Sequence, residues 1–133
     1  MSNKKLGNAF ETEFCEILAE HGFWVHNMVQ NAAGQPADVI AVKDGEAYLI
    51  DCKVCSNGKF PFTRIEDNQE WAMELWRDSG NDNGWFALKF GNDVYMVDMA
   101  AMKAARIHNS AMTPQLADMV YGWTLDEWLV SRT

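Results

Sequence analysis

Residues 6–20 carry the pattern of an amphipathic helix. Their apolar side chains recur three and four positions apart, as on one face of a helix, at Phe10, Phe14, Ile17 and Leu18. His21-Gly22 follows and supplies a stop signal. With Phe10 set at zero, Glu11 lies about 100° around the helix, at the border of the apolar stripe. We therefore expect Glu11 to reach the edge of a core.

Short runs rich in β-branched and aromatic residues follow this helix and predict strands. Phe23–Val29 is a candidate strand, and Asn31–Gln35 has the composition of a loop. Asp38–Val42 and Ala47–Val54 lie on either side of Asp44-Gly45, a dipeptide typical of a two-residue hairpin turn. The pattern therefore predicts an antiparallel hairpin.

The next segments combine a helix with a second hairpin. Thr63-x-x-Glu66 has the form of a capping box and predicts a helix that ends near Arg77. Trp85–Phe90 and Val94–Asp98 predict two strands joined by the turn Gly91-Asn92-Asp93. Short helices are expected beyond them, over Ala100–Ile107 and after Thr113-Pro114 and Thr124-x-x-Glu127.

This order of elements predicts an α/β fold with a mixed central β-sheet flanked by helices. The chain has 133 residues, of which 48% are hydrophobic, and it contains no linker or repeat. We expect a single domain over residues 1–133, with a core at about residues 6–98 and a C-terminal helical extension over 99–133. No apolar run approaches the ~20 residues of a membrane span, and three cysteines suit a reducing compartment, so a cytoplasmic location is expected.

The charge of the chain is strongly acidic. Eleven Lys and Arg residues stand against 19 Asp and Glu residues, which gives a net charge of −8. This sign is wrong for a protein that coats nucleic acid electrostatically. The first 65 residues hold six of the basic residues, so a polyanion should meet this half of the chain.

Two carboxylates and an amine are expected at one corner of the first hairpin. If Asp44-Gly45 is a two-residue turn, Asp38 lies opposite Asp51, with Cβ atoms about 4.5–5.5 Å apart. Lys53 points to the same face because side chains alternate along a strand. Opposed carboxylates suit a hard divalent cation such as Mg²⁺, with the carbonyl of Cys52 as a further ligand. This combination favours the hydrolysis of phosphodiesters.

A structural explanation of the same residues stays open at this point. Asp38 can be a residue that starts a strand, and Asp51 and Lys53 can form a solvated ion pair near a sheet edge. A register slip of one residue would also remove the pairing of the carboxylates.

Four short motifs together resemble a known nuclease superfamily. They are Gly7-Asn8-Ala9-Phe10-Glu11, His21-Gly22-Phe23, Pro36-Ala37-Asp38 and Asp51-Cys52-Lys53. Their order and spacing resemble the PD-(D/E)XK nucleases, particularly the archaeal-type and RecU-type Holliday junction resolvases. Lys59-Phe60-Pro61 followed by Asn68-Gln69 is similar to the RecU-type stretch after the catalytic strand. The resemblance spans about residues 6–98.

The resemblance implies a homodimeric, Mg²⁺-dependent endonuclease of DNA recombination and repair that cuts branched DNA, with Mn²⁺ able to substitute. Carried over by position, Glu11, Asp38 and Asp51 would hold metal, Lys53 would assist the attacking water and Gln69 would support the site. The basic residues expected to contact DNA are Lys5, Lys43, Lys59 and Arg64. By analogy, a small nuclease of this kind would suit a virus or mobile element, and then the host cytoplasm.

The chain departs from the family pattern in three ways, and two alternative functions follow. Asp51 stands where many members have Glu, Ala37 separates the proline from Asp38, and the surface is acidic. One alternative is a related nuclease for flapped, nicked or linear DNA. The other is a non-catalytic derivative of the fold that binds a protein through its acidic surface. The four intact site residues favour catalysis, and the net charge favours the last alternative.

Overall fold

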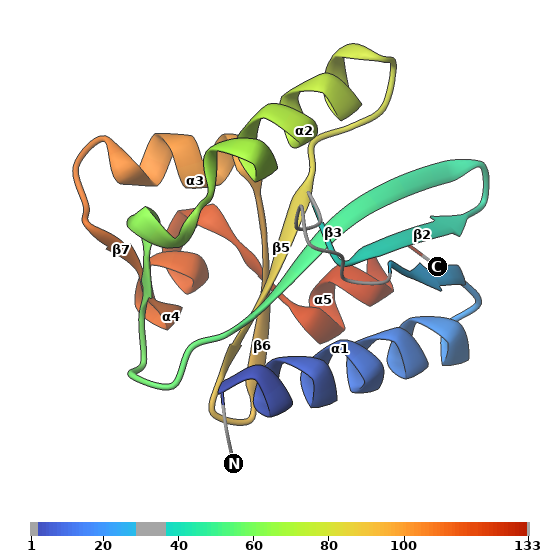
Figure 1. Ribbon diagram of the computed structural model, residues 1–133, viewed down its shortest axis with the longest axis horizontal. Coiled ribbons are helices and arrows are strands. Elements are labelled where there is room, and N and C mark those ends of the chain that lie inside the picture. The colour runs from blue at the N-terminus through green and yellow to red at the C-terminus, as the bar shows by residue number, and fades with distance from the viewer. Residues whose placement is uncertain (1–2, 29–36, 133) are drawn as a thin grey trace.

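The computed structural model describes residues 3–28 and 37–132, and in these ranges a six-stranded mixed sheet has the strand order β1-β2-β3-β5-β6-β8 (Figure 1). The sheet strands are β1 (Trp24–Asn27), β2 (Val39–Lys43), β3 (Glu46–Val54), β5 (Trp85–Phe90), β6 (Asp93–Asp98) and β8 (Trp123–Thr124). The helices are α1 (Asn3–Glu20), α2 (Asp67–Asp78), α3 (Met99–Arg106), α4 (Pro114–Leu116) and α5 (Leu125–Val130). Smaller elements are β4 (Phe60–Pro61), β7 (Ala111–Met112), a 3-10 turn (Phe62–Arg64) and a π-helical turn (Ala117–Tyr121).

The first hairpin has the turn and the register that the sequence predicts. Asp44 and Gly45 have φ values of 52° and 80°, and two consecutive positive values are typical of a type I′ turn. Lys43 pairs with Glu46, and the ladder continues to Val39 and Ile50. β3 then pairs in parallel with β5, which makes the sheet mixed.

Helices cover both faces of this sheet (Figure 1). On one face, α1 and α5 pack through a cluster that includes Phe10, Phe14, Leu18, Trp85 and Trp128. On the other face, α2 and α3 pack through a second cluster that includes Phe60, Met73, Phe86, Leu88 and Met102. Neighbouring residues of β5 thus belong to opposite clusters, as the alternation of side chains along a strand requires.

The last third of the chain completes both apolar clusters. Met102, Ala105 and Met112 lie in the cluster with α2, and Trp128 and Leu129 lie in the cluster with α1. Among the described residues, no helix has the length and apolar character needed to cross a membrane.

Two local predictions differ from the structure. The capping box of α2 consists of Glu66 and Gln69, and the predicted box at Thr63 is wrong because residues 62–64 form a 3-10 turn. Phe62 and Ile65 are buried on this segment, so core packing delays the start of the helix. β1 ends at Asn27, and the rest of the strand predicted to Val29 lies outside the described residues.

Candidate active site

A cavity of about 720 Å³ brings most of the predicted site residues together. Its lining residues come from α1, the start of β2, the end of β3 and the segment that leads into α2. Eight of the ten residues singled out in the sequence line it, namely Glu11, Asp38, Asp51, Cys52, Lys53, Lys59, Arg64 and Gln69. Lys5 and Lys43 do not line it.

Asp38 lies one residue before β2, just beyond the end of the β2–β3 ladder. Its amide donates to the Ile50 carbonyl at 3.1 Å, so Asp38 is not paired with Asp51 in the ladder as the regular register would require. Its carboxylate instead turns to the next strand, where Oδ2 accepts a hydrogen bond from the Cys52 amide at 2.8 Å. The side chain still adjoins Asp51, whose pKa it raises.

Asp51 is the most buried acid of the cavity, with 2% of its surface exposed. Its Oδ2 lies 3.2 Å from Lys53 Nζ, yet this buried oxygen has no hydrogen-bond partner among the described residues. Burial raises the pKa of Asp51 well above its usual range, Lys53 lowers it, and Asp38 raises it again. A solvated ion pair at a sheet edge does not describe this pair, because the side chains of Asp51 and Lys53 are only 3% and 16% exposed.

Glu11 joins these two carboxyl groups from helix α1. Phe10 and Phe14 pack α1 onto the sheet, and the half-buried Glu11 at the border of that apolar stripe faces the cavity, as its helical position predicts. Burial raises the pKa of Glu11 to about 7, and the charge of Asp38 and a hydrogen bond with it add to the shift. Lys53 acts in the opposite direction.

Gln69 forms the wall of the cavity on the side of α2 and is 4% exposed. Its side-chain oxygen accepts a hydrogen bond from the Glu66 amide at 3.3 Å, and the Glu66 side chain accepts one from the Gln69 amide. The sequence analysis missed Glu66 as a lining residue. The pattern Glu66-x-x-Gln69 was available as a signal, but Thr is the more usual N-cap residue.

Two of the predicted DNA-binding residues, Lys59 and Arg64, stand at this cavity, whereas Lys43 lies elsewhere. Arg64 Nη1 donates to the Val54 carbonyl at 3.1 Å, and its guanidinium lies 5.3 Å from the centre of the Phe60 ring. Lys43 lies at the turn end of β2, where its Nζ donates to the His21 carbonyl at 2.8 Å.

The donor set of the cavity suits a hard divalent cation. Asp38 raises the pKa of both Glu11 and Asp51, and the carboxylate oxygen Asp51 Oδ2, which accepts no hydrogen bond from the described residues, is the kind of ligand that such a cation prefers. In the placement that the structure gives the described residues, no three His, Cys, Asp or Glu side chains form a group that could hold a metal ion. The residues thus fit a cation by chemistry, and Glu11, Asp38 and Asp51 would have to draw closer around it.

Known proteins resemble this chain in sequence and in fold. The sequence model of a family described as archaeal Holliday junction resolvase (Hjc) matches residues 2–121. The crossover junction endodeoxyribonuclease Hjc of Methanocaldococcus jannaschii is 26% identical over 92 residues, which are 69% of this chain and 65% of that protein. This chain therefore spans about 65% of the length of that curated relative.

A solved structure supports the fold. Hjc of Archaeoglobus fulgidus, a Holliday junction resolvase from an archaeal hyperthermophile, superposes with a TM-score of 0.72 and 15% sequence identity, over 92% of this chain and 99% of that one. The predicted α/β class with a mixed central sheet is thus confirmed. The family model covers most of the sequence, and the chain therefore belongs to the archaeal Holliday junction resolvase (Hjc) family, within the PD-(D/E)XK nuclease superfamily.

Proposed function

We propose that this protein is a metal-dependent endodeoxyribonuclease that cuts phosphodiester bonds in branched DNA, with the four-way junction as its substrate. The observation that carries the proposal is the cavity that collects Glu11, Asp38, Asp51 and Lys53. Its relative in M. jannaschii is named a crossover junction endodeoxyribonuclease, which agrees with this chemistry.

Glu11, Asp38, Asp51 and the carbonyl of Cys52 would hold the cation, which we propose to be Mg²⁺, with Mn²⁺ able to replace it. When bound, it would supply an activated water and neutralise charge on the phosphate. Lys53 keeps its ammonium group 3.2 Å from Asp51 Oδ2, where it can stabilise the negative charge that develops on the phosphate and orient the water. Without the cation, burial and Asp38 raise the pKa of Glu11 to about 7, so part of the protein carries a proton on Glu11 near neutral pH.

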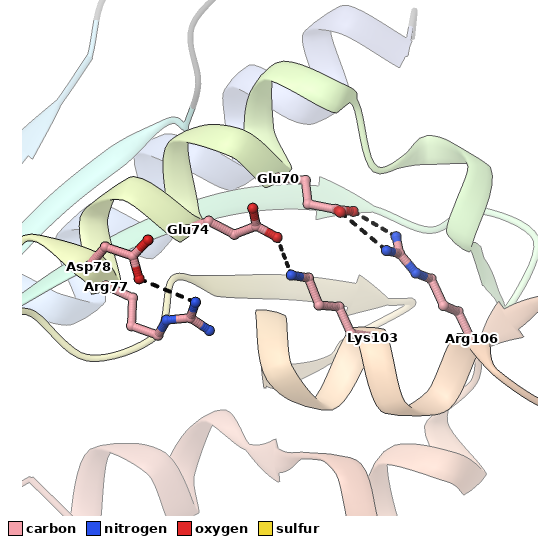
Figure 2. Close-up of polar contacts among 6 residues, drawn as sticks. All are labelled: Glu70, Glu74, Arg77, Asp78, Lys103 and Arg106. Carbon is pink, nitrogen blue, oxygen red and sulfur yellow. Dashed lines mark hydrogen bonds and ion pairs between the residues drawn. The ribbon is translucent and has the colours of Figure 1, made fainter.

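The pairing of basic residues accounts for how so acidic a protein could bind DNA at one place. Away from the cavity, four basic residues form ion pairs with acids, in the pairs Lys89–Glu13, Arg77–Asp78, Lys103–Glu74 and Arg106–Glu70. Figure 2 shows the last three of these pairs, on α2 and α3. Within the described residues, no ion pair joins Lys59 or Arg64 to a carboxylate. Their charge at the cavity is therefore available to phosphates.

We propose that the protein acts as a homodimer and as a single domain. Resolving a four-way junction needs two nicks, and each chain offers one such cavity, so two copies would supply one cut each. A role in DNA recombination and repair, in the cytoplasm, belongs to the same proposal.

Cleavage assays test the proposed function. Purified wild type, Asp51→Asn and Lys53→Ala are incubated with Mg²⁺ or EDTA and a labelled four-way junction, flap, linear duplex or single strand. We expect Mg²⁺-dependent, symmetric nicks in the junction, and a loss of about 100-fold or more in both variants, since Asp51→Asn removes a ligand of the cation and Lys53→Ala removes a positive charge at the reacting phosphate. Circular dichroism checks that the variants are folded.

Each other outcome identifies a different function. Cleavage of the flap or duplex as fast as the junction would keep the nuclease and remove the junction specificity. No cleavage by folded wild type would instead favour the non-catalytic protein that binds a partner through its acidic surface. A variant that cuts normally would overturn the assignment of the site.

A further inference from the structure

The capping box of α2 is part of the cavity wall. Its two residues, Glu66 and Gln69, both line the cavity, although the box serves to satisfy the first amides of a helix. Gln69 is 4% exposed, so its amide group has little freedom to turn. The Gln69 side chain therefore belongs both to the cap of helix α2 and to the candidate site.

The box determines which end of the Gln69 amide faces the cavity. The oxygen Oε1 accepts from the Glu66 N–H at 3.3 Å, and a flipped amide would place two donors against each other. The nitrogen Nε2 is therefore the end of the amide that is left for the cavity. Gln69 thus presents an N–H donor whose direction is set in advance.

Helix α2, which carries this donor, is held on α3 by ion pairs. Arg106 binds both carboxylate oxygens of Glu70, at 2.7 and 3.2 Å, and Lys103 binds Glu74 (Figure 2). Glu70 directly follows Gln69, so the first turn of α2 is fixed next to the donor. Donors on rigid elements lose less conformational freedom when a ligand binds.

A phosphate oxygen is the acceptor that fits such a donor. Glu11, Asp38 and Asp51 supply negative charge to the cavity and repel a phosphate, while Lys53 is engaged with Asp51. A neutral donor can bind a phosphate without pairing strongly with these carboxylates or competing with a cation for them. Non-bridging phosphate oxygens accept hydrogen bonds and carry no proton at neutral pH.

We propose that Gln69 binds the DNA backbone through Nε2, which donates to a non-bridging oxygen of the phosphodiester in the cavity. Glu66 acts as a positioning residue, because its backbone amide holds Oε1. This inference rests on the proposed function and deepens it by assigning a substrate contact and its orientation.

The test compares two substitutions that remove the donor in different ways. Gln69→Glu keeps the acceptor of the capping box, since Glu and Gln serve equally at this position, but adds charge. Gln69→Met removes the donor without adding charge, but loses the box. The matched control is Glu127→Gln in the Thr124–Glu127 box of α5, which has the same chemistry and does not line the cavity.

Affinity for a labelled four-way junction is measured in EDTA by fluorescence anisotropy, and kcat and KM are measured in Mg²⁺. We expect Kd and KM to rise about tenfold in both Gln69 variants and to stay unchanged in Glu127→Gln. The Tm should fall in both Gln69 variants, because Gln69→Met loses the capping box and Gln69→Glu places a further carboxyl group in a buried, acidic wall. A junction with one methylphosphonate at the contacted position should weaken binding by wild type and not by Gln69→Met.

The results that would overturn this inference alone differ from those that would overturn the proposed function. Weaker binding by Gln69→Glu alone would show a charge effect, and unchanged binding by both variants would show a purely structural capping role; either overturns the inference while wild type still cuts the junction. Wild type that neither binds nor cuts the junction would instead overturn the proposed function, and this inference with it.

Discussion

Glu11 illustrates how burial and a neighbouring acid can act on one side chain. Its pKa rises from an ordinary value of 4.5 to about 7, first through burial and then through Asp38. In the folded protein Glu11 therefore binds a proton over a pH range in which the unfolded chain has released it. This difference costs stability as pH rises, from near 4.5 until the folded state ionises near pH 7.

The pH dependence of stability should reveal this proton. In EDTA, the Tm of wild type should fall between pH 5 and pH 8, and it should fall less in Glu11→Gln, which has no proton to lose. Saturating Mg²⁺ should flatten the curve of wild type, because a cation that binds only the folded protein stabilises it most where the carboxyl groups are ionised. Scanning calorimetry at several pH values measures both effects. Parallel curves for the two proteins would contradict the raised pKa of Glu11.

The ion pairs on helices α2 and α3 should contribute differently to the free energy of unfolding. Glu70 and Arg106 join two helices through two hydrogen bonds, and their side chains are 27% and 37% exposed. Arg77 and Asp78 are sequence neighbours on α2, with side chains 49% and 66% exposed (Figure 2). Solvent screens the second pair more strongly, and it links no separate elements.

Double-mutant cycles with alanine should separate these two pairs. We expect a coupling of about 0.5–1 kcal/mol in the free energy of unfolding for Glu70 and Arg106, and a value near zero for Arg77 and Asp78. Urea denaturation of the single and double variants measures it. A coupling near zero for Glu70 and Arg106 as well would mean that this ion pair does not contribute to holding α2 on α3.

The elements that the sequence predicts are those with local causes. Helix α1 follows from its apolar spacing, and the β2–β3 hairpin follows from Asp44-Gly45, so Glu11, Asp51 and Lys53 could be placed in advance. β4, β7 and β8 could not, because each has two residues and owes its existence to a distant partner strand.

The sequence predicts the site residues that lie on one strand, and it misses those that distant segments of the chain bring to the cavity. Asp51, Cys52 and Lys53 share β3, but Glu66 reaches the cavity from a segment that is fixed by the burial of Phe62 and Ile65 in the core. The position of Lys43 depends on the His21 carbonyl 22 residues earlier. Such contacts between distant segments leave no periodic pattern in the sequence.

At the scale of the whole molecule, the net charge of −8 should restrict how DNA can approach. An excess of acidic residues repels phosphates, and the cavity, which Lys59 and Arg64 line, is where we propose that DNA makes contact. Few contacts imply that few counterions are released when DNA binds.

The salt dependence of binding should therefore be shallow. For two to four phosphate contacts, the slope of log K against log salt is about −2 to −3.5. Lys59→Ala should make the slope shallower by about 1, and Lys103→Ala, which breaks an ion pair away from the cavity, should not. Anisotropy titrations between 50 and 200 mM salt, in EDTA, measure the slopes. A steep slope in wild type would indicate a larger basic surface.

The burial of Trp128 has a consequence for the order of events during synthesis. This side chain is fully buried against Phe23, Tyr48 and Trp85, on the sheet face that also holds Cys52. While the ribosome is still making residues 99–124, that face has α1 as a cover but lacks α5 and Trp128, although Asp38, Asp51 and Lys53 have already been made. The packing of this sheet face can thus be completed only once α5 has left the exit tunnel, so a nascent chain carries every lining residue of the cavity before the core beside them is complete.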